Sequence, residues 1–291
     1  MRNAASVRAG IRTYARDNKV SAQIALQNYM LERLLVRIQL SPYADMLVLK
    51  GGMLVMSMLG ARARTTRDMD ATLKSCTLAK NPLMEMFEEI CSIDAGDGVR
   101  LDVISCHRMH ETDTYGGIRI GILARQESIR THLKVDITTG DAITPDAMRY
   151  VYPLMLDDGD LQVLAYNVET LLAEKIETIV SRGTQNTRMR DFYDVYMLEK
   201  AGHYDIATLG KALRATALHR KSTRQMDRCE TIVSELRNSK LMHVRWRDYR
   251  HDNRYATDID FSDACDATLR LARQYFCVDT SDEDLKRRAS P

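Results

Sequence analysis

Apolar residues at the start of the chain recur at helical spacing, and shorter apolar runs replace that pattern further on. From Ala5 through Ile38 they return every three or four positions, and a break over Asn18 to Ser21 interrupts them, which predicts two helices. The following segments alternate between strand and helix patterns: a strand over 46–49, a helix over 53–59, a strand over 67–74 and a helix over 83–92. A helix between neighbouring strands indicates mixed α/β order.

The middle of the chain favours further strands, and its last part favours helices. Residues 99–107, 117–125 and 133–138 are rich in β-branched side chains, so we expect antiparallel strands that extend the sheet. After Pro153 the spacing becomes helical again, over 168–181, 189–200, 206–218 and 263–275. We therefore predict an α/β (α+β) fold: a domain of residues 1–160, with an N-terminal helical segment and a mixed sheet flanked by helices, then a helical C-terminal domain of residues 161–291.

Composition is that of an ordinary globular enzyme. The chain has 291 residues, of which 45% are hydrophobic and 28% charged, so it can bury a substantial core. No apolar run approaches the roughly eighteen residues that a membrane span needs, and Met1 to Asp17 lacks the apolar core of a signal peptide. We expect a cytoplasmic protein with no membrane partner. The 6 cysteines are dispersed without a Cys-x-x-Cys pair, which predicts reduced thiols.

A glycine turn follows the first predicted strand. Gly51 and Gly52 allow their backbone N–H groups to approach an anion closely, and Lys50 adds a positive charge. The apolar helix that follows would direct its first N–H groups toward the same anion. We therefore predict that Lys50, Gly51 and Gly52 bind a nucleoside triphosphate (NTP). The further glycines of the dinucleotide fingerprint and the Gly-Lys-Ser/Thr ending of the Walker loop are absent.

Two carboxylates follow at strand spacing. Asp68 and Asp70 are two residues apart, so in an extended segment their side chains project from the same face and can bind one cation. Two carboxylates with phosphate oxygens and waters form a usual ligand set for magnesium. Asp136 offers a third carboxylate, because Val135 and Ile137 would point into the core and leave Asp136 on the open face. Asp102 has the same local pattern and is the alternative.

Four blocks of the sequence carry a family resemblance. They are Lys50-Gly51-Gly52 with Thr66-Arg67-Asp68-Met69-Asp70, then Lys134-Val135-Asp136-Ile137 with Gly140-Asp141-Ala142-Ile143-Thr144-Pro145, then Ala173-Glu174-Lys175-Ile176-Glu177, and finally Arg188-Met189-Arg190-Asp191-Phe192-Tyr193-Asp194. In this order they resemble the DNA polymerase beta type nucleotidyltransferases and, more narrowly, the AbiEii/AbiGii toxin family. The resemblance implies a polymerase-beta-like fold and covers the chain to about Leu218.

The resemblance also implies roles for particular residues. It implies that Asp68, Asp70 and Asp136 hold Mg²⁺ or Mn²⁺, and that Asp136 can accept the proton of the attacking hydroxyl. Family members carry a serine or threonine just before the aspartate pair. In this chain Arg67 separates Thr66 from Asp68, so we assign both Thr66 and Arg67 to nucleotide binding, and Arg62 and Arg64 are further arginines suited to phosphate.

The last two blocks lie on predicted helices. The resemblance implies that Lys175 binds the nucleotide phosphates and neutralises charge as pyrophosphate leaves. It also implies a catalytic aspartate in the fourth block, and both Asp191 and Asp194 qualify because residues three apart share a helix face. A different interpretation is structural: Lys175 or Arg190 pairs with these aspartates in a buried ionic contact between helices.

The expected activity is transfer of a nucleoside monophosphate from an NTP to an acceptor hydroxyl, with release of pyrophosphate. The resemblance implies a toxin of a toxin–antitoxin or phage-defence pair, hence a cognate antitoxin, and the end of a tRNA as acceptor. Net charge is only +2, but residues 208–254 carry twelve basic and five acidic side chains, which suits either an RNA backbone or a solvated helical face. Transfer to a protein or small molecule, or a binding module without catalysis, are the alternatives.

Overall fold

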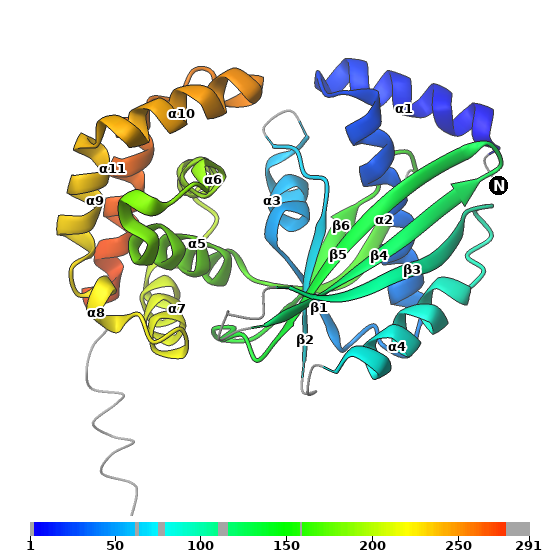
Figure 1. Ribbon diagram of the computed structural model, residues 1–291, viewed down its shortest axis with the longest axis horizontal. Coiled ribbons are helices and arrows are strands. Elements are labelled where there is room, and N and C mark those ends of the chain that lie inside the picture. The colour runs from blue at the N-terminus through cyan, green and yellow to red at the C-terminus, as the bar shows by residue number, and fades with distance from the viewer. Residues whose placement is uncertain (1–2, 62–63, 75–78, 110–115, 158, 278–291) are drawn as a thin grey trace, which may run out of the picture. The chain divides into compact units, whose positions relative to one another are not determined.

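The computed structural model describes residues 3–61, 64–74, 79–109, 116–157 and 159–277 (Figure 1). The chain forms two compact units: Met1–Asp141 with Ala147–Tyr166, and Ala142–Asp146 with Asn167–Pro291. The first contains the sheet, and the second is helical. Within the part of the chain that is described, no helix is long and apolar enough to cross a membrane. The five described cysteines are free thiols, as predicted, and Cys76 lies outside the described residues.

In the described residues, the sheet of the first unit has seven strands. They are β1 (Leu47–Lys50), β2 (Met69–Leu73), β3 (Arg100–Met109), β4 (Gly117–Gln126), β5 (Ile129–Thr139), β6 (Met148–Pro153) and β7 (Asp160–Ala165), in the order β3-β4-β5-β2-β1-β7-β6. The predicted antiparallel extension is present as β3, β4 and β5. However, β5 pairs with β2 in parallel, and β1 pairs with β7 in parallel, so the sheet is mixed.

Four helices of the first unit lie in the ranges that the structure describes. They are α1 (Ala4–Asn18), α2 (Ala22–Leu40), α3 (Gly51–Leu59) and α4 (Lys80–Ser92). The predicted break after α1 is confirmed: Lys19 adopts a left-handed conformation at the C-cap, and the Ser21 side chain caps α2 by accepting from the Ile24 N–H. Helix α2 packs against β5 and β7, α4 against β3, and α3 against β1 and β2. The helices therefore bury the apolar faces of the strands.

Helix α2 contains a buried acid, Glu32. Its side chain is 1% exposed, and Oε2 accepts a hydrogen bond from the Met155 N–H at 3.1 Å, in the connection between β6 and β7. Burial raises the pKa of Glu32 to about 8, although the Met155 hydrogen bond and the charge of Arg33 act in the opposite direction. At neutral pH the folded chain therefore keeps a proton that the unfolded chain releases.

We predict that Glu32→Gln stabilises the protein at neutral and alkaline pH. Between the ordinary value of 4.5 and the folded value of about 8, the wild type loses stability as pH rises, because only the unfolded state ionises freely. The glutamine keeps the acceptor for Met155 and removes this loss, so the gain should grow by about 1.4 kcal/mol per pH unit across that window. Urea unfolding at several pH values measures it. Glu88→Gln, on the exposed side of α4, is the control and should give no such slope.

The second unit is built from helices. They are α5 (Val168–Arg182), α6 (Met189–Ala201), α7 (Ile206–His219), α8 (Thr223–Met226), α9 (Cys229–Asn238), α10 (Lys240–Asp252) and α11 (Phe261–Ala272), with short 3₁₀ turns at Gly183–Gln185, Arg254–Ala256 and Arg273–Phe276. The four predicted helices correspond to α5, α6, α7 and α11. Aromatic contacts join α6, α10 and α11, since Phe261 packs on both Phe192 and Trp246. These rings form the centre of the helical unit.

Candidate active site

The first unit places two predicted carboxylates side by side on neighbouring strands. Asp70 of β2 lies directly opposite Asp136 of β5 in the parallel register, so both side chains leave the same face of the sheet. Val135 and Ile137 are fully buried on the other face, as predicted. Asp68 comes just before the first residue of β2 and is partly exposed. Asp70 and Asp136, distant in sequence, therefore meet, and Asp68 adjoins them through the chain.

The alternative third carboxylate, Asp102, lies elsewhere. It is on β3, the edge strand, and β4 and β5 separate that strand from β2. Its carboxylate pairs with Arg125 of β4 at 3.1 Å. The strand order therefore favours Asp136 over Asp102 as the partner of Asp70.

Asp68, Asp70 and Asp136 are together called the carboxylate row. The glycine turn contacts this row at Asp70. Helix α3 starts at Gly51, immediately after β1, and the Gly52 N–H donates to Oδ2 of Asp70 at 3.4 Å. Gly51 has φ +65°, and a Cβ added there would lie 2.1 Å from the same oxygen. A Cβ on Gly52 would lie 2.7 Å from Oγ1 of Thr66. Neither position has room for a side chain, so the two glycines let the start of α3 lie against Asp70.

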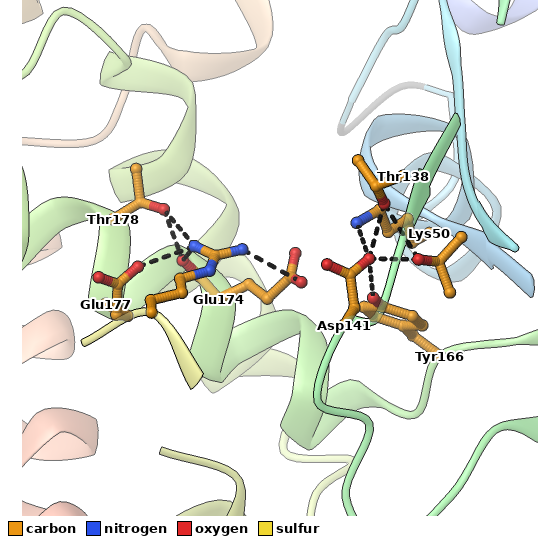
Figure 2. A network of polar contacts seen from close by, with 9 residues as sticks. Lys50, Thr138, Asp141, Tyr166, Glu174, Glu177 and Thr178 are labelled. Atoms are coloured by element: carbon orange, nitrogen blue, oxygen red, sulfur yellow. Dashed lines mark hydrogen bonds and ion pairs between the residues drawn. The ribbon is translucent and has the colours of Figure 1, made fainter. Parts of the chain in front are cut away.

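Lys50 forms an ion pair inside the first unit. Its Nζ donates to Oδ2 of Asp141 at 2.6 Å, and the Thr138 hydroxyl (2.7 Å) and the Tyr166 hydroxyl (3.0 Å) donate to the same oxygen, as Figure 2 shows. Thr72 also donates to it. Burial alone would raise the pKa of Asp141, but the charge of Lys50 and these hydrogen bonds hold it well below its usual range. Phosphate binding by Lys50 stays a prediction, and Lys50 also stabilises the junction of β1, β2 and β5.

The residues before β2 differ from one another in burial. Thr66 is buried, and its hydroxyl donates to the backbone carbonyl of Asp68 at 3.1 Å. Arg64 is 1% exposed, so it is not a solvated loop residue. Arg67 is exposed, and its carbonyl accepts from Gln27 at 2.7 Å. Arg62 lies outside the described residues. Of the two arginines of this group that the structure describes, Arg67 is therefore the one whose side chain is open to a ligand.

Arg119 was not predicted from the sequence, yet it lies in the carboxylate row. It is opposite Asp136 on β4, and it donates twice, from Nε to Oδ1 and from Nη2 to Oδ2, each at 2.7 Å. The alternation Ile118-Arg119-Ile120 places Arg119 on the polar face of the sheet, and this was the available signal. The sequence did not show which strand would lie beside it. Asp141 was noted as part of a family block, but its ion pair with Lys50 was not predicted, because the sequence did not show that β1 and the end of β5 lie close together.

The other three predicted catalytic residues lie together in the helical unit. Nζ of Lys175, on α5, is 3.2 Å from Oδ1 of Asp191 and 2.7 Å from Oδ2 of Asp194, both on α6. The Asp194 side chain is fully buried, and those of Lys175 and Asp191 are nearly so. The structural interpretation of these residues predicted a buried ionic contact between helices, and this contact is present. A role for Lys175 in nucleotide binding stays a prediction, and so does the choice between Asp191 and Asp194.

A second ionic group in the helical unit accounts for one residue of the basic stretch. Arg220, after α7, binds Glu174 at 3.1 Å and Glu177 at 2.8 Å, and it donates to the Thr178 hydroxyl at 3.1 Å (Figure 2). Other arginines of residues 208–254 also bind carboxylates or carbonyls of the same unit, namely Arg214, Arg237, Arg245 and Arg250. Trp246 is 2% exposed, and its indole N–H donates to the Ile259 carbonyl. Much of this stretch therefore contributes to the packing of the helical unit.

The carboxylate row has the donor chemistry of a magnesium or manganese site. All its ligand atoms are carboxylate oxygens, and Asp70 and Asp136 are in direct register. Yet among the described residues no three His, Cys, Asp or Glu side chains are arranged to hold a metal ion. Both oxygens of Asp136 accept hydrogen bonds from Arg119 instead. The residue types fit the ion, and an ion that used the lone pairs of Asp136 now occupied by Arg119 would have to displace the guanidinium.

A mixed sheet with a glycine turn against paired carboxylates is the arrangement expected of a nucleotidyltransferase, and comparison with known proteins agrees. Residues 33–270 match the family described as nucleotidyl transferase AbiEii toxin, type IV TA system. This match spans most of the chain and includes all four blocks noted in the sequence. The protein therefore belongs to this family and is a nucleotidyltransferase. Membership of a type IV toxin–antitoxin family implies a nucleotide substrate and an antitoxin partner.

Two solved structures from Helicobacter pylori are similar to this chain. JHP933 is 15% identical, with a TM-score of 0.46, and the match covers 93% of this chain and 99% of JHP933. The other, proposed to be a nucleotidyltransferase, is 16% identical with a TM-score of 0.46 over 87% of this chain and 95% of its own. No curated protein gives a significant match.

Proposed function

We propose that this enzyme transfers a nucleoside monophosphate from an NTP to the end of a tRNA, with Mg²⁺ or Mn²⁺ bound by Asp68, Asp70 and Asp136, and that this modification makes it toxic. The observation that carries the proposal is the direct pairing of Asp70 with Asp136 on neighbouring strands, with Asp68 just before β2. A bound divalent cation would neutralise phosphate charge and orient the triphosphate there.

The chain's own groups position the reactants and move one proton. The acceptor hydroxyl attacks the α-phosphorus, the bond to the β-phosphate breaks, and pyrophosphate leaves. Asp136 is suitably placed to accept the hydroxyl proton once its oxygens are released from Arg119. Arg67, exposed before β2, offers a guanidinium to the phosphates. Positioning and neutralisation of charge therefore account for most of the expected catalysis.

Labelled nucleotides test this proposal directly. The purified chain is incubated with each α-labelled NTP, with tRNA or cell protein, and with Mg²⁺, Mn²⁺ or EDTA. We expect label in tRNA with a divalent cation and no label with EDTA. Label in protein alone would replace tRNA with a protein acceptor, and equal labelling in EDTA would remove the metal from the proposal. Co-expression with the cognate antitoxin should restore growth if the activity is toxic.

We also propose that Lys175 is required for transfer. Variants that replace Lys175 and its two aspartate partners with uncharged residues test this proposal. Lys175→Met alone should lower the free energy of unfolding by about 3 kcal/mol or more, because it removes the lysine charge that lies 2.7 Å from the buried carboxylate of Asp194. A triple variant, Lys175→Met with Asp191→Asn and Asp194→Asn, leaves no unpaired charge and should regain most of that stability. We expect transfer to stay reduced about a hundredfold in both variants.

A matched variant separates the two roles of Lys175. Asp191→Asn with Asp194→Asn keeps the lysine and supplies neutral acceptors, so it serves as the control for the triple variant. If this control keeps the wild-type transfer rate, and the triple variant regains stability and transfers nucleotide equally well, Lys175 has only a structural role.

A further inference from the structure

Arg119 is bound to the carboxylate of Asp136, which is one of the proposed metal ligands. Its guanidinium makes two parallel hydrogen bonds of 2.7 Å with both oxygens of Asp136, the strongest geometry available to this pair. Asp136 is only 15% exposed and Arg119 is 43% exposed. The aspartate is therefore the fixed partner, and the arginine has space on the solvent side.

The arginine lies beside the carboxylate row. It binds Asp136 of β5, and Asp70 lies in direct register with Asp136 on the next strand, β2. Three carboxylates close together repel one another unless a cation lies among them. Arg119 supplies this cation when no metal is bound.

A divalent cation and Arg119 cannot bind Asp136 in the same way at once. Both oxygens of the aspartate are used by the guanidinium, and a cation bound there would lie within a few ångströms of another positive charge. A cation that takes the lone pairs now used by the guanidinium must displace it. Arg125 lies on the same strand as Arg119, β4, but does not bind a residue of the carboxylate row. It binds Asp102 on the edge strand β3.

We propose that Arg119 is an internal counter-ion that competes with the divalent metal for Asp136 and thereby sets the metal affinity of the enzyme. This inference rests on the proposed metal-dependent function. The metal-free row is held together by Arg119. Metal binding releases the guanidinium from Asp136, and the cost of that release weakens metal binding.

Metal binding without nucleotide tests this proposal. Mn²⁺ binding to the full chain is measured by electron paramagnetic resonance and calorimetry for the wild type and for Arg119→Met, Arg119→Lys and Arg125→Met. We expect Arg119→Met to bind Mn²⁺ at least about tenfold more tightly, with a lower Tm without metal and a larger rise in Tm on adding it. Arg119→Lys keeps the charge without the paired hydrogen bonds and should lie between. Arg125→Met should match the wild type.

The possible outcomes distinguish failure of this inference from failure of the proposed metal-dependent function. If the wild type binds Mn²⁺ and Arg119→Met binds it equally or more weakly, the inference is wrong and the metal-dependent function stands. If neither binds Mn²⁺, with or without NTP, both fail. Should Arg119→Met not fold, Arg119→Gln replaces it, because glutamine retains a donor to Asp136. An arginine that only contacts the substrate phosphates would leave Mn²⁺ affinity unchanged when nucleotide is absent.

Discussion

Asp70→Asn should reduce nucleotide transfer by about a thousandfold or more while the chain still folds. Asp70 lies between Lys50 and Asp136 in the strand register, and its Oδ2 accepts from the Gly52 N–H. Asparagine has the same shape and can still accept this hydrogen bond, so the fold should be kept. It lacks the charge needed to bind a divalent cation beside Asp136. Steady-state labelling measures the rate, and circular dichroism with thermal unfolding measures the fold.

Two further aspartates complete this experiment. Asp136→Asn should lose activity to a similar extent, because it removes the adjoining charge. Asp102→Asn is the matched control, since Asp102 has the same local sequence pattern but lies on the edge strand beside Arg125. It should retain the wild-type rate. A wild-type rate in Asp70→Asn, with toxicity also unchanged, would instead show that transfer does not depend on the charge of Asp70 and would overturn the metal-site assignment.

The alternation of side chains along strands was readable from the sequence, and the order of the strands was not. The two-residue period correctly placed Val135 and Ile137 in the core and Asp136 on the open face. The same period left Asp102 equivalent, because local alternation carries no information about neighbours. The choice depended on β5, and not β3, pairing with β2, which is a contact between segments far apart in the chain.

Two of the elements missed by the sequence, β6 and α10, have weak hydrophobic patterns. In β6 only Tyr152 is buried, because the strand lies at the sheet edge, so its alternation is faint. Helix α10 buries only Met242 and Trp246 along its length, and its many charges concealed that spacing. Arginines such as Arg220 and Arg245 looked like a surface for RNA, but they bind partners within the helical unit. A charge count cannot distinguish these two uses.

Gly51→Ala should be among the most damaging single substitutions in the first unit. Two costs combine there: a left-handed φ of +65°, worth about 1–2 kcal/mol for a residue with a Cβ, and overlap with Asp70, which should add about 2 kcal/mol or more. The new Cβ would lie 2.1 Å from Oδ2 and 2.7 Å from Cγ of Asp70, so the carboxylate must also move. We expect a loss of about 4 kcal/mol in unfolding free energy together with a large loss of transfer. Urea unfolding and the labelling assay measure the two effects.

Two variants separate the costs at Gly51. Gly96→Ala has nearly the same φ, +66°, but no atom within 4 Å of the added Cβ, so it should show the backbone cost alone, about 1–2 kcal/mol. In a Gly51→Ala, Asp70→Ala double variant the two nearest atoms disappear, whereas Cβ of Asp70, at 2.8 Å, remains. The second substitution should therefore recover only part of the overlap cost, and this recovery is the coupling energy between the two positions. Equal losses for Gly51→Ala and Gly96→Ala, with no coupling to Asp70, would mean that the start of α3 does not lie against this carboxylate.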